Sequence, residues 1–148
     1  MGVIFIDIDF YTNLYLNINK VENRKLKVDT IIKRNNSLVV KQNILNLKNN
    51  QELLIILQNI KTKEQFKCNY LIEDNNIVLL VDSLLNLFTD YEGALQILCK
   101  NDDIYYLYTP ILNESIIVDD QNCSDKPYKL FLRVLENKEL RISAVCKK

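Results

Sequence analysis

Residues 128–146 are YKLFLRVLENKELRISAVC, in which apolar side chains take every second position on both sides of a polar pair, Asn137-Lys138. The alternating residues are Tyr128, Leu130, Leu132 and Val134 before this pair, and Leu140, Ile142, Ala144 and Cys146 after it. Side chains of a β-strand point alternately to its two faces, so period two places one face against a core and the other against water. Residues 128–134 and 140–146 are therefore predicted to be two antiparallel strands joined by a short turn.

The same period recurs along most of the chain, in short runs that end at Asn, Asp or Lys clusters. The further alternating runs are residues 14–18, 26–28, 66–72 and 95–99. Residues 53–57 and 77–81 are apolar throughout, which is typical of central strands covered on both faces. This pattern predicts an all-β fold: an antiparallel two-sheet β-sandwich of immunoglobulin-like or jelly-roll-like type.

One segment, residues 82–88, departs from this alternation. Its apolar side chains fall at i, i+1, i+3 and i+4 behind an Asp-Ser pair: Leu84, Leu85, Leu87 and Phe88. Because Asp and Ser cap the free N–H groups of a first helical turn, the segment predicts one short helix. Gly93 follows it and is expected to supply a positive φ or a close backbone approach. No linker, repeat or charge block interrupts the chain, so residues 1–148 are expected to form a single domain.

The composition excludes several kinds of site. The 148 residues include no histidine, which removes triads with a histidine base and zinc–histidine sites. The 19 basic and 19 acidic residues balance, so the chain has no charge footprint for nucleic acid. The four cysteines form no Cys-x-x-Cys pair, and Cys68 and Cys99 lie in apolar runs where we expect them to be buried. No metal and no cofactor is predicted.

The sequence also gives expectations about location. Apolar runs such as residues 53–57 are far shorter than the roughly 20 residues that span a bilayer, so no membrane insertion is expected. The first residues lack the basic region and the small-residue cleavage site of a secretory signal. The cytoplasm is therefore the expected compartment.

The candidate binding residues are three tyrosines and the two carboxylates that precede them: Tyr105, Tyr106, Tyr108, Asp102 and Asp103. Exposed tyrosines with acidic neighbours can stack on sugar rings and bind hydroxyl groups, or form a protein interface. Alternation places Tyr106 on the face opposite Tyr105, so one side of this strand belongs to the core. The alternative is that these tyrosines are strand formers with their hydroxyls at the rim of the sheet.

Two acidic groups are candidate metal ligands. Asp7 and Asp9 follow an apolar run, as in phosphatases of the haloacid dehalogenase type, where the first Asp is a nucleophile at a Mg²⁺ site. Phe10 and Tyr11 stand where that family has Gly and Thr, so a solvent-facing acidic pair on an edge strand is the preferred interpretation. The second group lies in an expected loop: Asp119, Asp120 and Asp125. That loop lacks the spacing of an EF-hand, and we expect it to be solvated.

Three stretches in the second half of the chain carry a family resemblance: residues 81–88 (VDSLLNLF), 91–97 (YEGALQI) and 102–107 (DDIYYL), with a tail over 127–142. Together they resemble the β-sandwich accessory domains found beside bacterial cell-wall polysaccharide transferases, such as the CDP-glycerol glycerophosphotransferases of teichoic acid synthesis. The tail is similar to the closing hairpin of those domains, whereas Leu95 stands where they carry an aromatic residue. The resemblance implies a non-catalytic scaffold, or a binding surface for a polymer or a partner protein.

Three functions follow as hypotheses. The first is a non-catalytic interaction or carbohydrate-associated module, accessory to cell-envelope polysaccharide assembly, with a protein or polysaccharide as its partner. The second is a structural subunit of a larger assembly, such as a phage or surface component. The third is a Mg²⁺-dependent phosphatase that uses Asp7 and Asp9.

Overall fold

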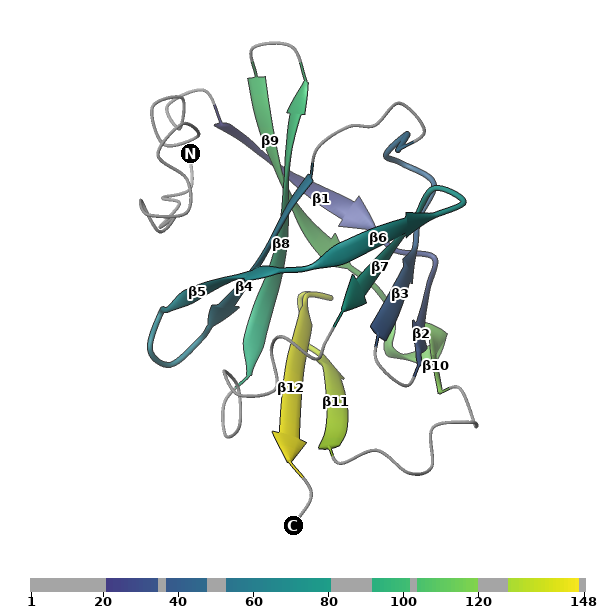
Figure 1. The fold of residues 1–148 in the computed structure, drawn as a ribbon, viewed down its shortest axis with the longest axis vertical. Coiled ribbons are helices and arrows are strands. Elements are labelled where there is room, and N and C mark those ends of the chain that lie inside the picture. The colour runs from purple at the N-terminus through teal and green to yellow at the C-terminus, as the bar shows by residue number, and fades with distance from the viewer. Residues whose placement is uncertain are drawn as a thin grey trace.

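The computed structural model describes residues 21–34, 37–47, 53–80, 92–101, 104–119 and 128–146. These residues form two sheets and one 3-10 turn, η3 (Glu114–Ile116) (Figure 1). The strands are β1 (Val21–Lys27), β2 (Thr30–Lys33), β3 (Ser37–Lys41), β4 (Leu53–Asn59), β5 (Gln65–Cys68), β6 (Tyr70–Glu73), β7 (Asn76–Leu80), β8 (Gly93–Asn101), β9 (Ile104–Ile111), β10 (Ile117–Asp119), β11 (Tyr128–Val134) and β12 (Leu140–Cys146). The all-β, two-sheet prediction is confirmed. The helix predicted over residues 82–88 lies outside the described residues.

The larger sheet is built around β8. Ile97 of β8 pairs with β4 on one edge and with β9 on the other, and the sheet continues to β5 beyond β4 and to β1 beyond β9. The edge of β8 that pairs with β9 also pairs with β12. The contact with β12 is made near the start of β8, by Gly93 and Ala94. This β8–β12 ladder has two residue pairs, against seven between β11 and β12. The β11–β12 hairpin is therefore joined to the sheet along a short seam.

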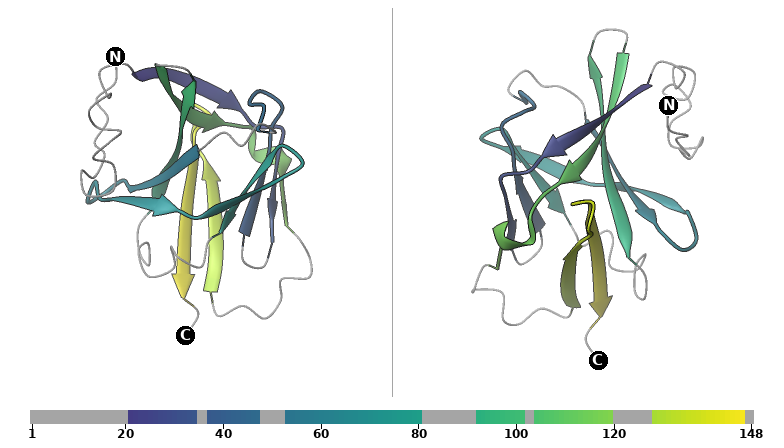
Figure 2. Two further views of the ribbon diagram at one scale, coloured as in Figure 1. Left: turned by 45° about the horizontal axis from the view of Figure 1, so that its top comes forward. Right: turned by 180° about the vertical axis from the view of Figure 1, so that it is seen from behind.

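The smaller sheet has the strand order β10-β2-β3-β7-β6. The sandwich needs one correction, because its sheets are mixed and not purely antiparallel: β1 pairs with β9, and β2 with β10, in parallel. The chain crosses from the larger to the smaller sheet from β1 to β2 and again from β9 to β10, and these crossings run side by side in one direction (Figure 2, right). The Val28 N–H donates to the Ile111 carbonyl at 3.0 Å and ties the two crossings together.

The main core lies between the two sheets. Ile55 and Ile97 of the larger sheet and Ile31 and Ile77 of the smaller sheet are all fully buried there. These residues occupy the alternate positions that period two assigns to an inner face. Removing this apolar surface from water is the main favourable contribution to folding.

A second apolar cluster lies on the opposite, outer face of the larger sheet. It consists of Val21, Ile56, Leu98, Tyr105 and Leu107. In β4, therefore, successive residues contribute to the two clusters in turn. This explains why residues 53–57 are apolar throughout, as the sequence predicted for a strand covered on both faces.

No helix in the part of the chain that the structure describes is long and apolar enough to cross a bilayer.

Candidate functional site

The three candidate tyrosines lie on β9, and the strand separates them onto two faces. Tyr105 points to the outer face and is 5% exposed within the second apolar cluster. Tyr106 lies on the face opposite Tyr105, as alternation predicted. This is the inner face, where Tyr108 is buried in the main core and Tyr106 is half-buried. Tyr106 is thus the candidate tyrosine whose ring is most open to a ligand.

Strand β1 brings two charged side chains to the same place. In the parallel β1–β9 ladder, Glu22 is the partner of Tyr106 and Arg24 is the partner of Tyr108. The guanidinium carbon of Arg24 lies 4.5 Å from the centre of the Tyr106 ring, a cation–π contact. Arg24 Nη2 also donates to Glu22 Oε1 at 3.1 Å. We call these four residues the Arg24–Tyr106 site.

The Arg24–Tyr106 site combines an aromatic surface with opposite charges at the edge of a sheet. The rings of Tyr106 and Tyr108 are 6.3 Å apart between centres and tilted by 41°. The side chains of Arg24 and Glu22 are 49% and 51% exposed, so both charges meet solvent. The site therefore offers guanidinium donors, carboxylate acceptors and an aromatic ring within one small area.

Two groups of this site, the Arg24 guanidinium and the Tyr108 phenol, have raised pKa values. The hydrogen bond to Glu22 raises the pKa of the Arg24 guanidinium above its ordinary value. Burial raises the pKa of the Tyr108 phenol, which therefore stays protonated. A group that exchanges protons during a reaction works best with a pKa near the operating pH, and neither of these two groups has one.

Most acidic candidates from the sequence lie outside the described residues: Asp7, Asp9, Asp102, Asp103, Asp120 and Asp125. The backbone of Asp119 is in β10. The described part of the chain contains no group of three His, Cys, Asp or Glu side chains that could hold a metal ion. The metal-dependent phosphatase therefore stays an untested prediction.

Cys68 and Cys99 are buried, as the sequence predicted. Burial raises the pKa of the Cys68 thiol to about 12 and also raises that of Cys99. Thiols with raised pKa values are poor nucleophiles, and these two act as small apolar residues of the core.

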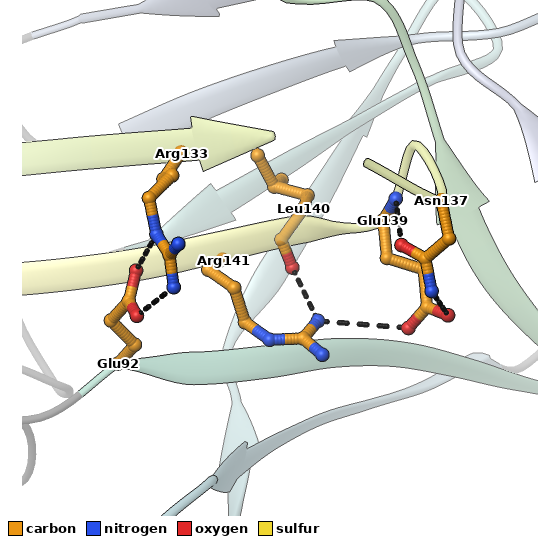
Figure 3. Close-up of polar contacts among 6 residues, drawn as sticks. All are labelled: Glu92, Arg133, Asn137, Glu139, Leu140 and Arg141. Carbon is orange, nitrogen blue, oxygen red and sulfur yellow. Dashed lines mark hydrogen bonds and ion pairs between the residues drawn. The ribbon is translucent and has the colours of Figure 1, made fainter. Parts of the chain in front are cut away.

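A second polar cluster lies on the outer face of the β11–β12 hairpin (Figure 3). Arg133 makes two hydrogen bonds to the carboxylate of Glu92, one from Nε to Oε2 at 2.7 Å. Arg141, its neighbour on β12, donates to the Leu140 carbonyl at 3.1 Å and lies 3.6 Å from Glu139. Glu92 directly precedes β8, so the Arg133–Glu92 pair fastens the hairpin where its ladder is shortest. This arrangement has a structural role.

The fold and the site define a two-sheet, mixed β-sandwich with an aromatic and charged patch at one sheet edge. The chain matches no protein-family model and no curated protein sequence.

Among solved structures, the chain is similar to TarS of Staphylococcus aureus, a teichoic acid glycosyltransferase. A crystal structure of TarS residues 217–571 aligns with a TM-score of 0.51 and 6% identity over 84% of this chain and 39% of that one. A second TarS structure aligns with a TM-score of 0.52 and 7% identity over 84% of this chain and 25% of that one. The chain thus spans less than half the length of either TarS chain. At this identity the likeness concerns the fold, and it agrees with the resemblance drawn from residues 81–142.

Proposed function

We propose that the chain is a non-catalytic interaction module, accessory to cell-envelope polysaccharide assembly, and that it binds carbohydrate at the Arg24–Tyr106 site. Two independent lines support the association with envelope polysaccharide. The second half of the sequence resembles accessory domains beside teichoic acid transferases, and the fold is similar to part of TarS. The setting of Tyr106 carries the proposal of a binding site.

Proteins bind sugars with aromatic rings that pack on the C–H faces of the sugar. Charged groups add hydrogen bonds to the sugar hydroxyls. The ring of Tyr106 is half-buried and therefore held in place, with Arg24 against one side. Glu22 accepts hydrogen bonds and Arg24 donates them, and about half of each side chain faces solvent. Since both side chains already contact each other, little conformational freedom is lost when a ligand binds.

The non-catalytic part of the proposal is supported by the chemistry of the same residues. The cation is an arginine with a raised pKa, and Tyr108 has a raised phenolic pKa. Such groups hold and orient a ligand but do not exchange protons readily near neutral pH. We also propose a cytoplasmic location, with polysaccharide or a protein of its assembly machinery as partner.

Isothermal titration of the full chain with purified teichoic acid, and separately with neutral dextran, tests this function. Wild-type protein is expected to bind at least one of these polymers, and Tyr106→Ala is expected to abolish the heat of binding. Arg24→Gln is expected to weaken binding about tenfold or more, since a charge-assisted hydrogen bond is lost.

Arg34→Gln is a matched control. Arg34 is another half-exposed arginine with one carboxylate partner, Glu73 at 3.2 Å, but it directly follows β2 of the smaller sheet. This variant should bind like the wild type. The proposal is overturned if wild-type protein binds neither polymer, or if Arg24→Gln and Arg34→Gln weaken binding equally.

The structural-subunit alternative is favoured by one observation, the long edge strand β11. This strand lies at a different edge of the larger sheet from β1 and the Arg24–Tyr106 site.

A further inference from the structure

Within the described residues, five strands lie at sheet edges: β1, β5 and β11 in the larger sheet, and β6 and β10 in the smaller. An edge strand exposes backbone groups that can pair with another chain, and proteins protect such edges with short strands or charged side chains. Strands β5, β6 and β10 have four, four and three residues, and the exposed positions of β1 include Glu22, Arg24 and Lys25. Strand β11 has seven residues, and Phe131 at its centre is 51% exposed.

The ladder to β12 fixes which backbone groups of β11 point outward. Just beyond this ladder, the Leu135 N–H donates to the Glu139 carbonyl at 2.8 Å. Leu135, and every second residue before it, therefore exchanges hydrogen bonds with β12. The residues between them direct their N–H and C=O groups to the outer edge: Leu130, Leu132 and Val134. Their side chains are partly buried against the main core, so a neighbouring strand would complete their burial.

We propose that β11 pairs with β11 of a second copy of this chain, antiparallel and about a two-fold axis at Leu132. In this register the two Leu132 residues are partners, and Leu130 of one copy is opposite Val134 of the other. The inner face then joins aliphatic side chains to aliphatic side chains. On the outer face, Phe131 of one copy lies opposite Arg133 of the other, which allows a cation–π contact across the interface.

Other registers fit the strand less well. An axis at Phe131 uses a residue whose backbone already bonds to β12. An axis at Leu130 leaves Val134 outside the paired region. Arg133 remains available in the chosen register, because 60% of its side chain is exposed even while it holds Glu92.

Two substitutions of the exposed residue Phe131 distinguish the register with its axis at Leu132 from the other registers. Phe131→Glu and Phe131→Lys both remove the ring, but the first places a carboxylate opposite Arg133 of the second copy and the second places a like charge there. Analytical ultracentrifugation of the full chain, at concentrations up to about 1 mM, measures the result. We expect a dimer for the wild type and for Phe131→Glu, and at least about tenfold weaker dimerisation for Phe131→Lys.

Two further variants complete the test. Leu132→Pro removes an N–H that faces the outer edge, and it should give a monomer whose circular dichroism still shows strand. Leu71→Lys, on edge strand β6 where Leu71 is 55% exposed, should dimerise like the wild type. A wild type that is monomeric throughout, equal dimerisation of the two Phe131 variants, or a dimer broken by Leu71→Lys would overturn the proposal.

Discussion

At Gly93, the absence of a side chain is a packing requirement. Its φ is not positive, so of the two reasons expected from the sequence, close approach is the correct one. A Cβ at this position would lie 2.8 Å from Cγ of Leu57, which is 1% exposed and enclosed by the core. Gly93→Ala is therefore expected to lower the free energy of unfolding by about 1–3 kcal/mol, measured by urea denaturation.

A double-mutant cycle gives the control for this substitution. In a Leu57→Ala background the colliding atoms are gone, so adding Gly93→Ala should cost much less than in the wild type. An equal cost in both backgrounds would show that the contact with Leu57 does not explain the glycine.

At the Arg24–Tyr106 site, the sequence pattern predicted the faces of the tyrosines but not the charged residues beside them. Alternation along β9 correctly placed Tyr106 opposite Tyr105, because the side-chain direction in a strand is a local property. Arg24 and Glu22 were missed as site residues, because only the parallel β1–β9 pairing brings them to Tyr106. Such pairing depends on strand order, which no local pattern encodes.

At the scale of elements, the strands predicted over residues 128–134 and 140–146 coincide with β11 and β12. By contrast, β1 covers Val21–Lys27, although the sequence indicated a run only over 26–28. The four residues before Leu26 are all exposed at the sheet edge, so they do not alternate in polarity. For this physical reason the period of β1 does not show in the sequence.

The segment after β3 is held to the β6–β7 turn by the amide of Gln42, which is 5% exposed. Its oxygen accepts from the N–H groups of Ile44 and Leu45, and its nitrogen donates to the carbonyl of Asn75 at 2.7 Å. Gln42→Ala leaves these groups without a partner and is expected to lower the free energy of unfolding by about 1–3 kcal/mol.

Gln58→Ala is the comparison, because Gln58 makes a longer, exposed hydrogen bond of 3.4 Å to Lys63. Its cost in urea denaturation should be clearly smaller. Comparable losses for both glutamines would contradict the importance of the Gln42 contacts.

The ion pair that joins β8 to the β11–β12 hairpin makes stability depend on pH. Hydrogen bonds from Arg133 lower the pKa of Glu92 below its ordinary value of 4.5. A carboxyl whose pKa is lower in the folded state adds stability above its unfolded pKa, and this contribution is lost as pH falls through the folded value. Glu92→Gln should therefore be less stable than the wild type near neutral pH and equally stable in strong acid.

Thermal unfolding from about pH 7 to pH 2 measures this difference. Glu136→Gln, an exposed glutamate in the same hairpin, serves as the control. If Glu92→Gln and wild type differ by a constant amount at every pH, the ion pair does not supply the stabilisation.

For the whole molecule, the two-sheet architecture was predictable because alternating burial repeats along the chain, and the fold is similar to that of TarS at 6% identity. The strand order was not predictable, since two parallel pairings join segments far apart in the sequence. The same limit applies to function: the candidate tyrosines are local features, whereas the Arg24–Tyr106 site is a product of the assembled sheet.

The most direct test of the proposed function is an NMR titration of the isotope-labelled full chain with purified teichoic acid. Binding at the Arg24–Tyr106 site predicts the largest amide shift changes in Glu22, Arg24, Tyr106 and Tyr108, and their loss in Tyr106→Ala. Shift changes centred on another surface, or none at any polymer concentration, would contradict it.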